Sequence, residues 1–439
     1  MSKKNKEFVG ASLIQKRRAW YLYDWANSAY STTVITLFLG PFLTTLAKSI
    51  EKNNLVNFFG FHIPAGSVFP YSISISVLLQ ALLLPIIGSL ADLTKRKTIY
   101  LAIFTIIGSL STILFFFINS SIFILGSLLL IISNLAFGAA VVIYNSFLNE
   151  IADIDEREVI SSKGWAIGYL GGGTLLLINL ILFLNYEKIG LSQIFAIKIN
   201  IALAGIWWAL FSIPIITKFK TTHSSVFKKN KLKIIKDSFS QLYSTLKNST
   251  LYPTSLLFLV AYLFYNDGVQ SVISLSSQFG QEELKLNISF LTIVILVVQF
   301  VAAFGSMIFM KISLLFNEKK SILFAIFIWM LILIYAFTFL KGSTDFLILA
   351  IIIALVMGGI QSISRSLFSK LIPEGKEAEY FSLYEVSEKG TSWMGPFLFG
   401  LIYQYTFSYR YAILSLIVFF IIGGIILLFT KINVNKINS

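Results

Sequence analysis

Long apolar runs follow one another from end to end of this chain, and they constrain its fold more than any other feature. A helix needs about 20 residues to cross the hydrocarbon core of a bilayer, where it satisfies its own backbone polar groups. Twelve runs reach this length, at residues 20–47, 66–91, 98–118, 121–148, 162–185, 196–217, 251–278, 288–313, 321–340, 346–370, 379–404 and 408–431. The sequence therefore predicts an all-α membrane protein with twelve transmembrane helices.

The composition agrees with a membrane protein. Hydrophobic residues make up 56% of the chain and charged residues only 13%, whereas soluble chains of this length carry far more charge. The first run is too long for a signal-peptide core and lacks a small-residue cleavage site, so we expect it to remain in the mature protein. The chain has no cysteine, which excludes disulfides, thiolate metal sites and cysteine nucleophiles.

The net charge of +14 is unevenly distributed. Basic residues cluster at 3–18, 95–97, 218–247 and 311–320, which all fall on one side of a twelve-span topology. The positive-inside rule then places both termini in the cytoplasm. A surface that faces the anionic inner leaflet of the bilayer explains the basic charge more simply than a nucleic-acid partner does.

The chain divides near its middle at a long polar loop, with six predicted spans on each side. NSFLNEI (145–151) resembles RSLFSKL (365–371), and YDWANS (23–28) resembles YNDGVQS (265–271). Parallel repeats of six spans are typical of the major facilitator fold. The predicted parts are an amino-terminal six-helix bundle, a basic cytoplasmic linker and a carboxy-terminal six-helix bundle, at 1–217, 218–250 and 251–439. Apolar residues on one face of the linker predict an amphipathic helix on the membrane surface, with a flexible linker as the alternative.

A polar stripe lies inside the first span. Asp24, Asn27, Ser28 and Ser31 follow the spacing of one helix face. A carboxylate that faced lipid would be costly, so we expect the stripe to face the bundle interior or a cavity. A structural ion pair used for assembly is the alternative.

A similar stripe lies in the seventh span, with Asp267, Gln270, Ser271 and Ser274. Gly268, beside the carboxylate, suggests a locally flexible or broken helix. We predict that both stripes contribute to a central cavity.

Polar residues of spans ten and eleven complete the predicted cavity. Glu385 and Lys389 are one turn apart, and a self-neutralising ion pair is the alternative interpretation. Arg365 lies near a helix end, where its long side chain can instead reach the membrane surface. The predicted substrate and ion site comprises Asp24, Asn27, Asp267, Gln270, Gln361, Arg365, Glu385 and Lys389.

A possible gate follows the second span. Gly88, Asp92 and Arg96 fit the Gly-x-x-x-Asp loop motif of major facilitators, in which the Asp caps a helix and the basic residues hold the cytoplasmic gate. The fit is partial, because Leu93 and Lys95 stand where the motif usually has Arg and Gly.

The sequence gives no sign of an enzyme. HExxH, GxSxG and GxxxxGK[ST] are absent, and the two histidines, His62 and His223, lie far apart in the sequence. GYLGGG (168–173) sits inside a span, so close helix packing explains it better than dinucleotide binding does. We therefore expect no catalytic residues, no cofactor and no metal.

Several blocks together are similar to one family. YDWANSAY, YNSFLNEI, SSKGWAIGYLGG, FYNDGVQ, GGIQSISRSLFSKLIP and EYFSLYEVSEKGTSWMGP resemble the vacuole-effluxer family of the major facilitator superfamily. Its members include autophagy-related protein 22-like vacuolar amino-acid exporters and many bacterial relatives. The resemblance spans nearly the whole chain and implies a twelve-helix fold and export of small solutes, amino acids foremost.

The predicted function is secondary transport by the rocking of two six-helix bundles around a central cavity. Asp24, Asp267 or Glu385 is the candidate carrier of a coupling proton, because burial favours the protonated carboxyl. The expected location is the inner membrane of a bacterium or the vacuolar membrane of a eukaryote. Transport of another solute, such as a drug or a sugar, stays open, as do a membrane-embedded enzyme and a non-transporting receptor or scaffold.

Overall fold

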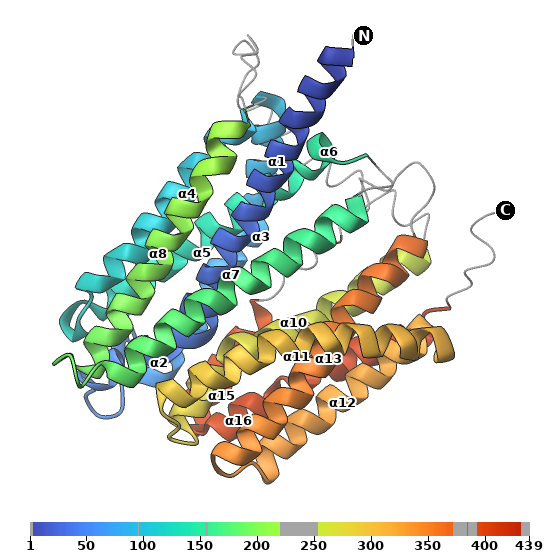
Figure 1. Ribbon diagram of the computed structural model, residues 1–439. Coiled ribbons are helices and arrows are strands. Elements are labelled where there is room, and N and C mark those ends of the chain that lie inside the picture. The colour runs from blue at the N-terminus through green and yellow to red at the C-terminus, as the bar shows by residue number, and fades with distance from the viewer. Residues whose placement is uncertain are drawn as a thin grey trace. The chain divides into compact units, whose positions relative to one another are not determined.

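The computed structural model describes residues 3–94, 96–153, 157–219, 253–371, 384 and 393–431, and almost all of its regular structure is helical (Figure 1). Within these residues, 11 helical segments are long and apolar enough to cross a membrane. They coincide with the predicted spans except that at 379–404, of which the described residues include only part. The prediction of an all-α, multi-pass membrane protein is confirmed.

The elements follow one another along the chain with short connections. The first half contains α1 (Lys3–Ala29), the π-helix η1 (Tyr30–Phe38), α2 (Leu39–Lys48), β1 (Val56–Phe58), β2 (Phe61–Ile63), η2 (Ala65–Ser67), α3 (Val68–Thr94), α4 (Lys97–Leu114), η3 (Phe115–Phe117), η4 (Ser120–Ile122), α5 (Phe123–Ser146), α6 (Leu148–Ile151), α7 (Arg157–Asn185) and α8 (Gln193–Lys218). The second half contains α10 (Pro253–Glu282), α11 (Ile288–Phe316), α12 (Glu318–Thr338), α13 (Gly342–Leu371), α15 (Met394–Thr406), α16 (Tyr409–Ser415) and α17 (Ile417–Phe429).

The helices group into two compact units. Unit 1 comprises Met1–Phe38 and Leu83–Ser238, and unit 2 comprises Leu39–Leu82 and Phe239–Ser439. Residues 39–82 therefore pack with the carboxy-terminal half of the chain, although the sequence pattern assigns them to the amino-terminal repeat. The predicted division into bundles at 1–217 and 251–439 stays a prediction.

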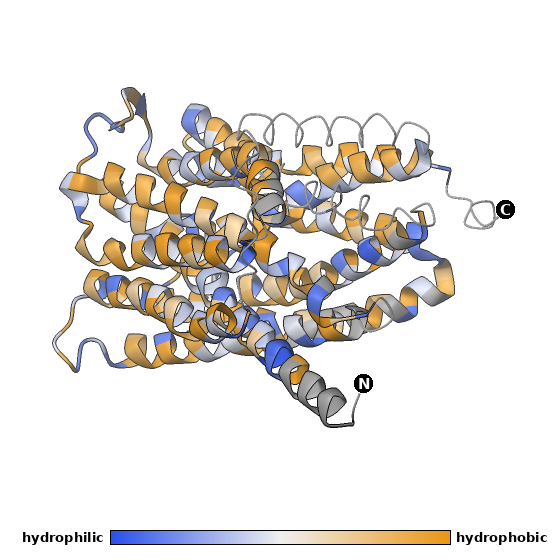
Figure 2. Ribbon diagram, turned by 90° about the horizontal axis from the view of Figure 1, so that it is seen from above, coloured by the Kyte–Doolittle hydropathy of each residue, from blue (hydrophilic) through white to orange (hydrophobic). Residues whose placement is uncertain are grey.

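The outer faces of the helices are apolar, as a lipid environment requires. Hydrophilic residues gather at the loops and helix ends, while hydrophobic residues dominate the helices (Figure 2). On α4, for example, Ile103, Ile106 and Leu110 lie on one face and are exposed by 44%, 60% and 53%. A soluble protein would rarely expose such a continuous apolar stripe, whereas lipid tails cover it at no cost.

The first predicted span changes its helical geometry midway. Residues 13–48 form one 36-residue apolar segment, in which the π-helix η1 separates α1 from α2. Hydroxyl groups of this segment bond back to the preceding turn, with Thr32 Oγ1 donating to the Ser28 carbonyl at 2.8 Å and Thr36 Oγ1 to the Ser31 carbonyl at 3.0 Å. Such bonds compete with the backbone ladder and bend helices.

A short hairpin joins α2 to α3, where the hydropathy pattern predicts only a connection. β1 and β2 pair antiparallel, with Val56 opposite Ile63 and Phe58 opposite Phe61. The turn residues Phe59 and Gly60 have φ of 50° and 92°, values that suit the tight turns of two-residue hairpins.

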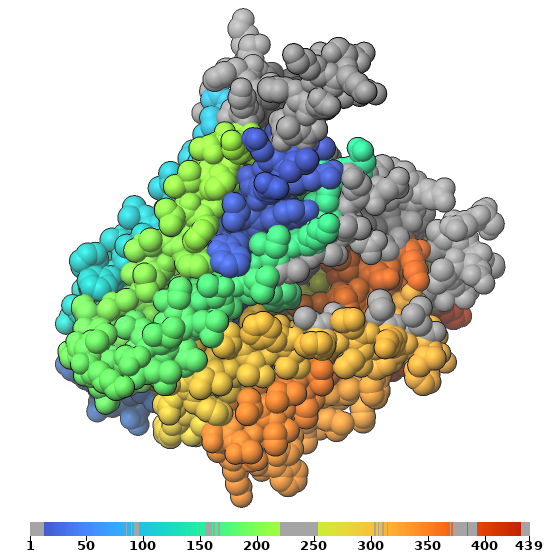
Figure 3. Space-filling view, in the orientation of Figure 1, coloured from blue at the N-terminus to red at the C-terminus, as the bar shows by residue number. Residues whose placement is uncertain are grey.

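Unit 1 is held together by close helix contacts. α1 lies between α7 and α8 and packs against both (Figure 3). A Cβ atom on Gly108 of α4 would lie 2.3 Å from the ring of Trp208 in α8, so glycine is what allows α4 and α8 to approach. Trp208 also contacts Tyr30, whose hydroxyl is 2.8 Å from Ser133 Oγ of α5.

Unit 2 uses glycine in the same way. A Cβ on Gly268 would lie 2.7 Å from the Phe420 ring of α17. The expectation of a broken helix at Gly268 is wrong, because α10 runs without interruption through it; the glycine instead makes room for an aromatic ring. Arg410 of α16 closes the end of α12 by donating to the carbonyls of Phe337 and Leu340 at 3.0 and 2.8 Å.

The predicted amphipathic helix in the 218–250 linker lies outside the described residues.

The topology can be tested within unit 1. Asp153 and Lys188 are exposed residues before and after α7, a helix of 29 residues and therefore about 44 Å long. Because the chain has no cysteine, Asp153→Cys and Lys188→Cys each provide a single thiol. We expect an impermeant maleimide to label the thiol at 188 in intact cells and the thiol at 153 only after permeabilisation. Labelling of both thiols in intact cells would contradict the predicted topology.

Candidate functional site

The polar stripe of α1 faces the glycine-rich side of α7. A Cβ on Gly164 would lie 2.5 Å from Asp24 Oδ2, and a Cβ on Gly168 would lie 2.7 Å from Ser28 Oγ. Asp24 and Ser28 are half-buried, and Asn27 is only 5% exposed. The glycines at 164 and 168 belong to a small-xxx-small pattern, which brings helix backbones together in membranes. The stripe therefore points into unit 1, as the expectation of an interior-facing stripe requires.

Aromatic residues fix the start of this stripe. The ring of Trp20 stacks on Tyr144 of α5 at 4.6 Å, and its Nε1–H donates to the Tyr144 carbonyl at 3.1 Å. Tyr23 stacks on the other side of Tyr144 at 4.9 Å, and the Tyr144 hydroxyl is an electrostatic neighbour of Asp24. Two sequence blocks that carry the family resemblance, around YDWANSAY and YNSFLNEI, thus contact each other directly.

The opposite side of α1 is fixed by α8. Trp207 Nε1–H donates to the Trp25 carbonyl at 3.3 Å, and the two indole rings stack at 5.8 Å. A Cβ on Gly171 of α7 would lie 2.4 Å from that same carbonyl oxygen. The backbone of α1 at Trp25 therefore has no room for a side chain on α7.

In unit 2, Asp267 is fully buried and holds the first turn of α15. The Gly395 N–H donates to Asp267 Oδ2 at 3.1 Å, and Ser271 Oγ donates to the Asp267 carbonyl at 2.6 Å. A carboxylate that accepts a bond from a free N–H of a first helical turn is favoured by hydrogen bonding and by the helix dipole. A Cβ on Gly395 would lie 1.9 Å from Ser271 Oγ, so this position requires glycine.

The two units repeat this arrangement. In each, an Asp and a Ser one helical turn apart, Asp24 with Ser28 or Asp267 with Ser271, pack on a glycine of the fifth span of the same predicted repeat. The sequence comparison of 145–151 with 365–371 makes a further pair equivalent, because it places Ser364 where Tyr144 stands. Ser364 Oγ lies 2.7 Å from the hydroxyl of Tyr265, the counterpart of Tyr23. The weak sequence repeat thus corresponds to equivalent contacts in the two units.

The other predicted site residues are less closely connected. Gln270 of α10 and Gln361 of α13 are half-buried, and Arg365, one turn after Gln361, is exposed. Glu385 and Lys389 lie outside the described residues. Their neighbour Tyr384 is described, and its ring stacks on Tyr262 of α10 at 4.4 Å and on Phe368 of α13 at 5.1 Å.

The predicted gate residues lie at the junction of α3 and α4. Gly88 is half-buried, and a Cβ there would meet Val142 of α5 at an ordinary 3.4 Å. The backbone of Asp92 lies in the last turns of α3, but its side chain is outside the described parts of the chain. Arg96 is half-buried and precedes α4, where the next residue, Lys97, is 3.8 Å from Glu150.

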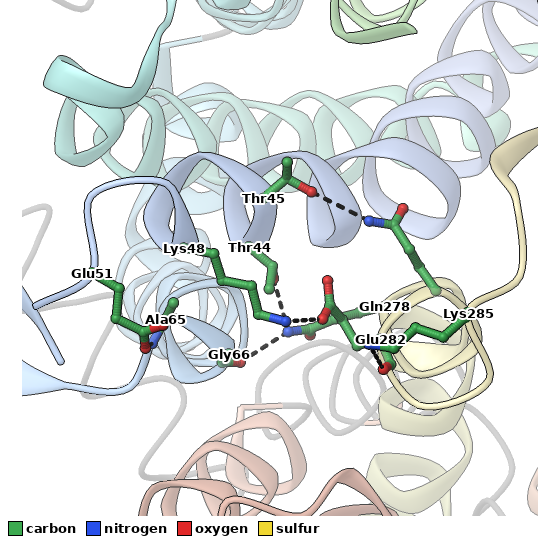
Figure 4. A network of polar contacts seen from close by, with 10 residues as sticks. Thr44, Thr45, Lys48, Glu51, Ala65, Gly66, Gln278, Glu282 and Lys285 are labelled. Atoms are coloured by element: carbon green, nitrogen blue, oxygen red, sulfur yellow. Dashed lines mark hydrogen bonds and ion pairs between the residues drawn. The ribbon is translucent and has the colours of Figure 1, made fainter. Parts of the chain in front are cut away.

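A polar network in unit 2 was missed by the sequence analysis (Figure 4). Three side chains at the end of α10 contact α2 and η2. Gln278 Nε2 donates to Thr44 Oγ1 at 2.9 Å and to the Gly66 carbonyl at 2.8 Å, and Gln281 Nε2 donates to Thr45 Oγ1 at 3.2 Å. Glu282 forms an ion pair with Lys48. The spacing of 278, 281 and 282 on one helix face is the signal that would have indicated a polar interface.

Metal binding has no support in the part of the chain that the structure describes. No group of three or more His, Cys, Asp or Glu residues that could hold a metal ion occurs there.

Comparisons with known proteins agree with the sequence and the fold. The model of the family "Vacuole effluxer Atg22 like" matches residues 15–438. The uncharacterized MFS-type transporter YxiO of Bacillus subtilis is 34% identical over 94% of each chain. Autophagy-related protein 22 of Vanderwaltozyma polyspora is 26% identical over 92% of this chain and 88% of its own.

Solved structures identify the fold. The nucleoside transporter NupG superposes with a TM-score of 0.67 at 12% identity, covering 96% of this chain and 100% of its own. A bacterial homologue of the human lysosomal transporter Spinster superposes with a TM-score of 0.65 at 15% identity and 98% coverage of both chains. The predicted major facilitator fold is thereby confirmed.

The close approach of α1 and α7 can be tested with two alanine substitutions. In Gly171→Ala the new methyl group overlaps a backbone carbonyl, which no side-chain rotation can relieve. Overpacking of this kind costs about 1–3 kcal/mol. We expect a thermal unfolding midpoint several degrees below that of the wild type. Gly88→Ala is the matched control, since its methyl group meets only an ordinary contact. Equal midpoints for the two variants would refute the proposed packing.

Proposed function

Because this chain belongs to the vacuole effluxer Atg22-like family, we propose that it exports small organic solutes, amino acids foremost, by alternating access. The observation that carries the proposal is the arrangement found in both units, a carboxylate and a hydroxyl packed on a glycine of a neighbouring transmembrane helix. Ionisable groups are rare inside a membrane and usually serve transport or proton transfer.

The proposed binding residues match the two charged groups of an amino acid. In unit 1, the half-buried Asp24 and the buried Asn27 supply a carboxylate and an amide, which suit a substrate ammonium group. In unit 2, the exposed Arg365 supplies a guanidinium, which pairs with a carboxylate in a bidentate geometry. Gln270, Gln361, Glu385 and Lys389 are proposed to complete the set.

Asp267 has a different proposed role, because its carboxylate already accepts the Gly395 N–H. Hydrogen bonds to a charged carboxylate are roughly twice as strong as those to a neutral group. Protonation of Asp267 would therefore loosen its hold on the start of α15. We propose that a coupling proton acts here or at Asp24, so that protonation is linked to a change in helix position.

The proposed location follows the family and the charge pattern. The chain is a multi-pass membrane protein, and we propose that its termini face the cytoplasm, at an inner or a vacuolar membrane. Gly88, Asp92 and Arg96 are proposed to gate that side, while the anionic inner leaflet covers the basic loops.

A binding screen tests the solute class. A ligand that binds only the folded state at 100 times its Kd stabilises a protein by about 2.7 kcal/mol, enough to raise the unfolding midpoint measurably. We expect one or more amino acids, rather than sugars or nucleosides, to raise the midpoint of the purified protein. Asp24→Asn should lose this shift but unfold normally without ligand. Asp153→Asn, an identical change at an exposed loop residue, is the control and should keep the shift.

The screen also separates the alternatives. A shift caused by a sugar or a drug, with none caused by amino acids, would reassign the substrate class. No shift with any solute would favour a non-transporting receptor or scaffold.

Proton coupling has its own test in proteoliposomes that contain the solute identified by the screen. We expect an imposed pH gradient to drive its uptake in the wild type and a protonophore to abolish this. In Asp267→Asn we expect movement down the solute gradient to persist without acceleration by the pH gradient. Gradient-driven uptake that is unchanged in both Asp24→Asn and Asp267→Asn would refute a coupling role for these carboxyls.

A further inference from the structure

The polar network between α2 and α10 links segments that are far apart in the chain. Its members from α2 are Thr44, Thr45 and Lys48, and those from α10 are Gln278, Gln281 and Glu282. Each contact joins residues more than 200 positions apart. In Figure 4 these side chains converge on one another across the space between the two helices.

A second seam runs parallel in sequence between α3 and α15. Ser67, Tyr71 and Ser74 lie on one face of η2 and α3, at intervals of four and three residues. Their hydroxyl groups donate to α15 and the residue before it, to the carbonyls of Gly400 at 2.9 Å and Trp393 at 2.9 Å and to Gln404 Oε1 at 2.5 Å. Residues 39–82 are thus joined to two helices of the carboxy-terminal half by hydrogen bonds in two rows.

These seams differ in kind from the contact between α1 and α7. There, glycines allow one backbone to lie against another, and nothing polar has to be resolvated to keep it closed. In the seams, donors and acceptors meet singly and can exchange their partners for water at a small net cost. The side chain of Lys48 is already 39% exposed, whereas that of Glu282 is 6% exposed, so water reaches one end of the ion pair.

The chain connectivity shows where the seams would open. The boundary between the units cuts two continuous helical segments, after Phe38 at the end of η1 and after Leu82 within α3. Residues 39–82 are therefore covalently tied to unit 1 at both ends while they bind to unit 2 through polar contacts. Two bundles that alternate in a transport cycle must part somewhere, and hydrogen bonds part more easily than continuous helices do.

We propose that the two seams form a reversible latch, centred on Gln278, which breaks and re-forms once in each transport cycle. Gln278 is central because its single amide nitrogen binds both α2 and η2, through Thr44 and the Gly66 carbonyl. The Glu282–Lys48 ion pair closes the exposed end of the latch. This inference rests on the proposed alternating access, but it does not depend on which solute is carried.

The test uses a thiol hidden beneath the latch. Ala47 lies on the same face of α2 as Thr44 and Lys48 and is fully buried, and Ala47→Cys gives the cysteine-free chain one reporter. Labelling by a maleimide is followed in lipid nanodiscs, where both membrane faces are open to water. Because no solute is added, failure of the solute screen leaves this measurement intact.

Glu282→Gln and its neighbour Glu283→Gln form a matched pair in this reporter background. Glu283 pairs with Arg410, which lies outside the latch, at 2.6 Å. We expect Glu282→Gln and Gln278→Leu each to raise the labelling rate about threefold to tenfold, as the loss of one net hydrogen bond predicts. Glu283→Gln should leave the rate unchanged. Equal rates for the two glutamate variants, or no labelling in any background, would overturn the latch.

Cross-linking provides a second arm. Thr45→Cys with Gln281→Cys places two thiols across the latch, and Glu283→Cys with Arg410→Cys places two thiols at a contact within the carboxy-terminal half. A short bifunctional thiol reagent that spans the latch pair should stop solute movement, and a reductant should restore it. Cross-linking of the control pair should leave movement intact. Full movement through a protein cross-linked at 45 and 281 would also overturn the latch.

Discussion

The need to satisfy every polar group without water governs how this chain packs. Inside a bilayer, a carboxylate or hydroxyl on a helix must find its partner on a neighbouring helix, and only small residues bring that helix close enough. Asp24 and Ser28 meet Gly164 and Gly168 in unit 1, and Asp267 meets Gly395 in unit 2. The polar stripes and the glycines are therefore two parts of one device, and neither is tolerable in lipid without the other.

Much of the fold could be predicted because hydropathy reports directly on a membrane span. The apolar runs locate the helices to within a few residues, and the matching blocks at 145–151 and 365–371 lead to equivalent contacts at Tyr144 and Ser364. Hydropathy does not say which helix a polar residue will face. The contact of Asp267 with Gly395, and the packing of residues 39–82 in unit 2, were for that reason beyond the sequence.

Local geometry was also beyond a pattern based on apolar runs. The π-helix and the hairpin at 56–63 depend on hydroxyl bonds and on positive φ angles, which leave little trace in hydropathy. Gly268 shows the same limit from the other direction. Its residue type permits a break in the helix, but the ring of Phe420 fills the space that it leaves, and α10 continues.

The π-helix at Tyr30–Phe38 has a consequence for how one helix serves two partners. Each of its turns takes in one residue more than an α-turn, and one residue corresponds to about 100° of rotation around a helix axis. The side chains after Phe38 are thus turned relative to those before Ala29, so that Asp24 addresses α7 while Thr44 and Lys48 address α10. The span works as a spliced rod whose joint sets the aim of each half. Losing a single residue at that joint would shorten the rod very little, yet it would rotate one half away from its neighbour.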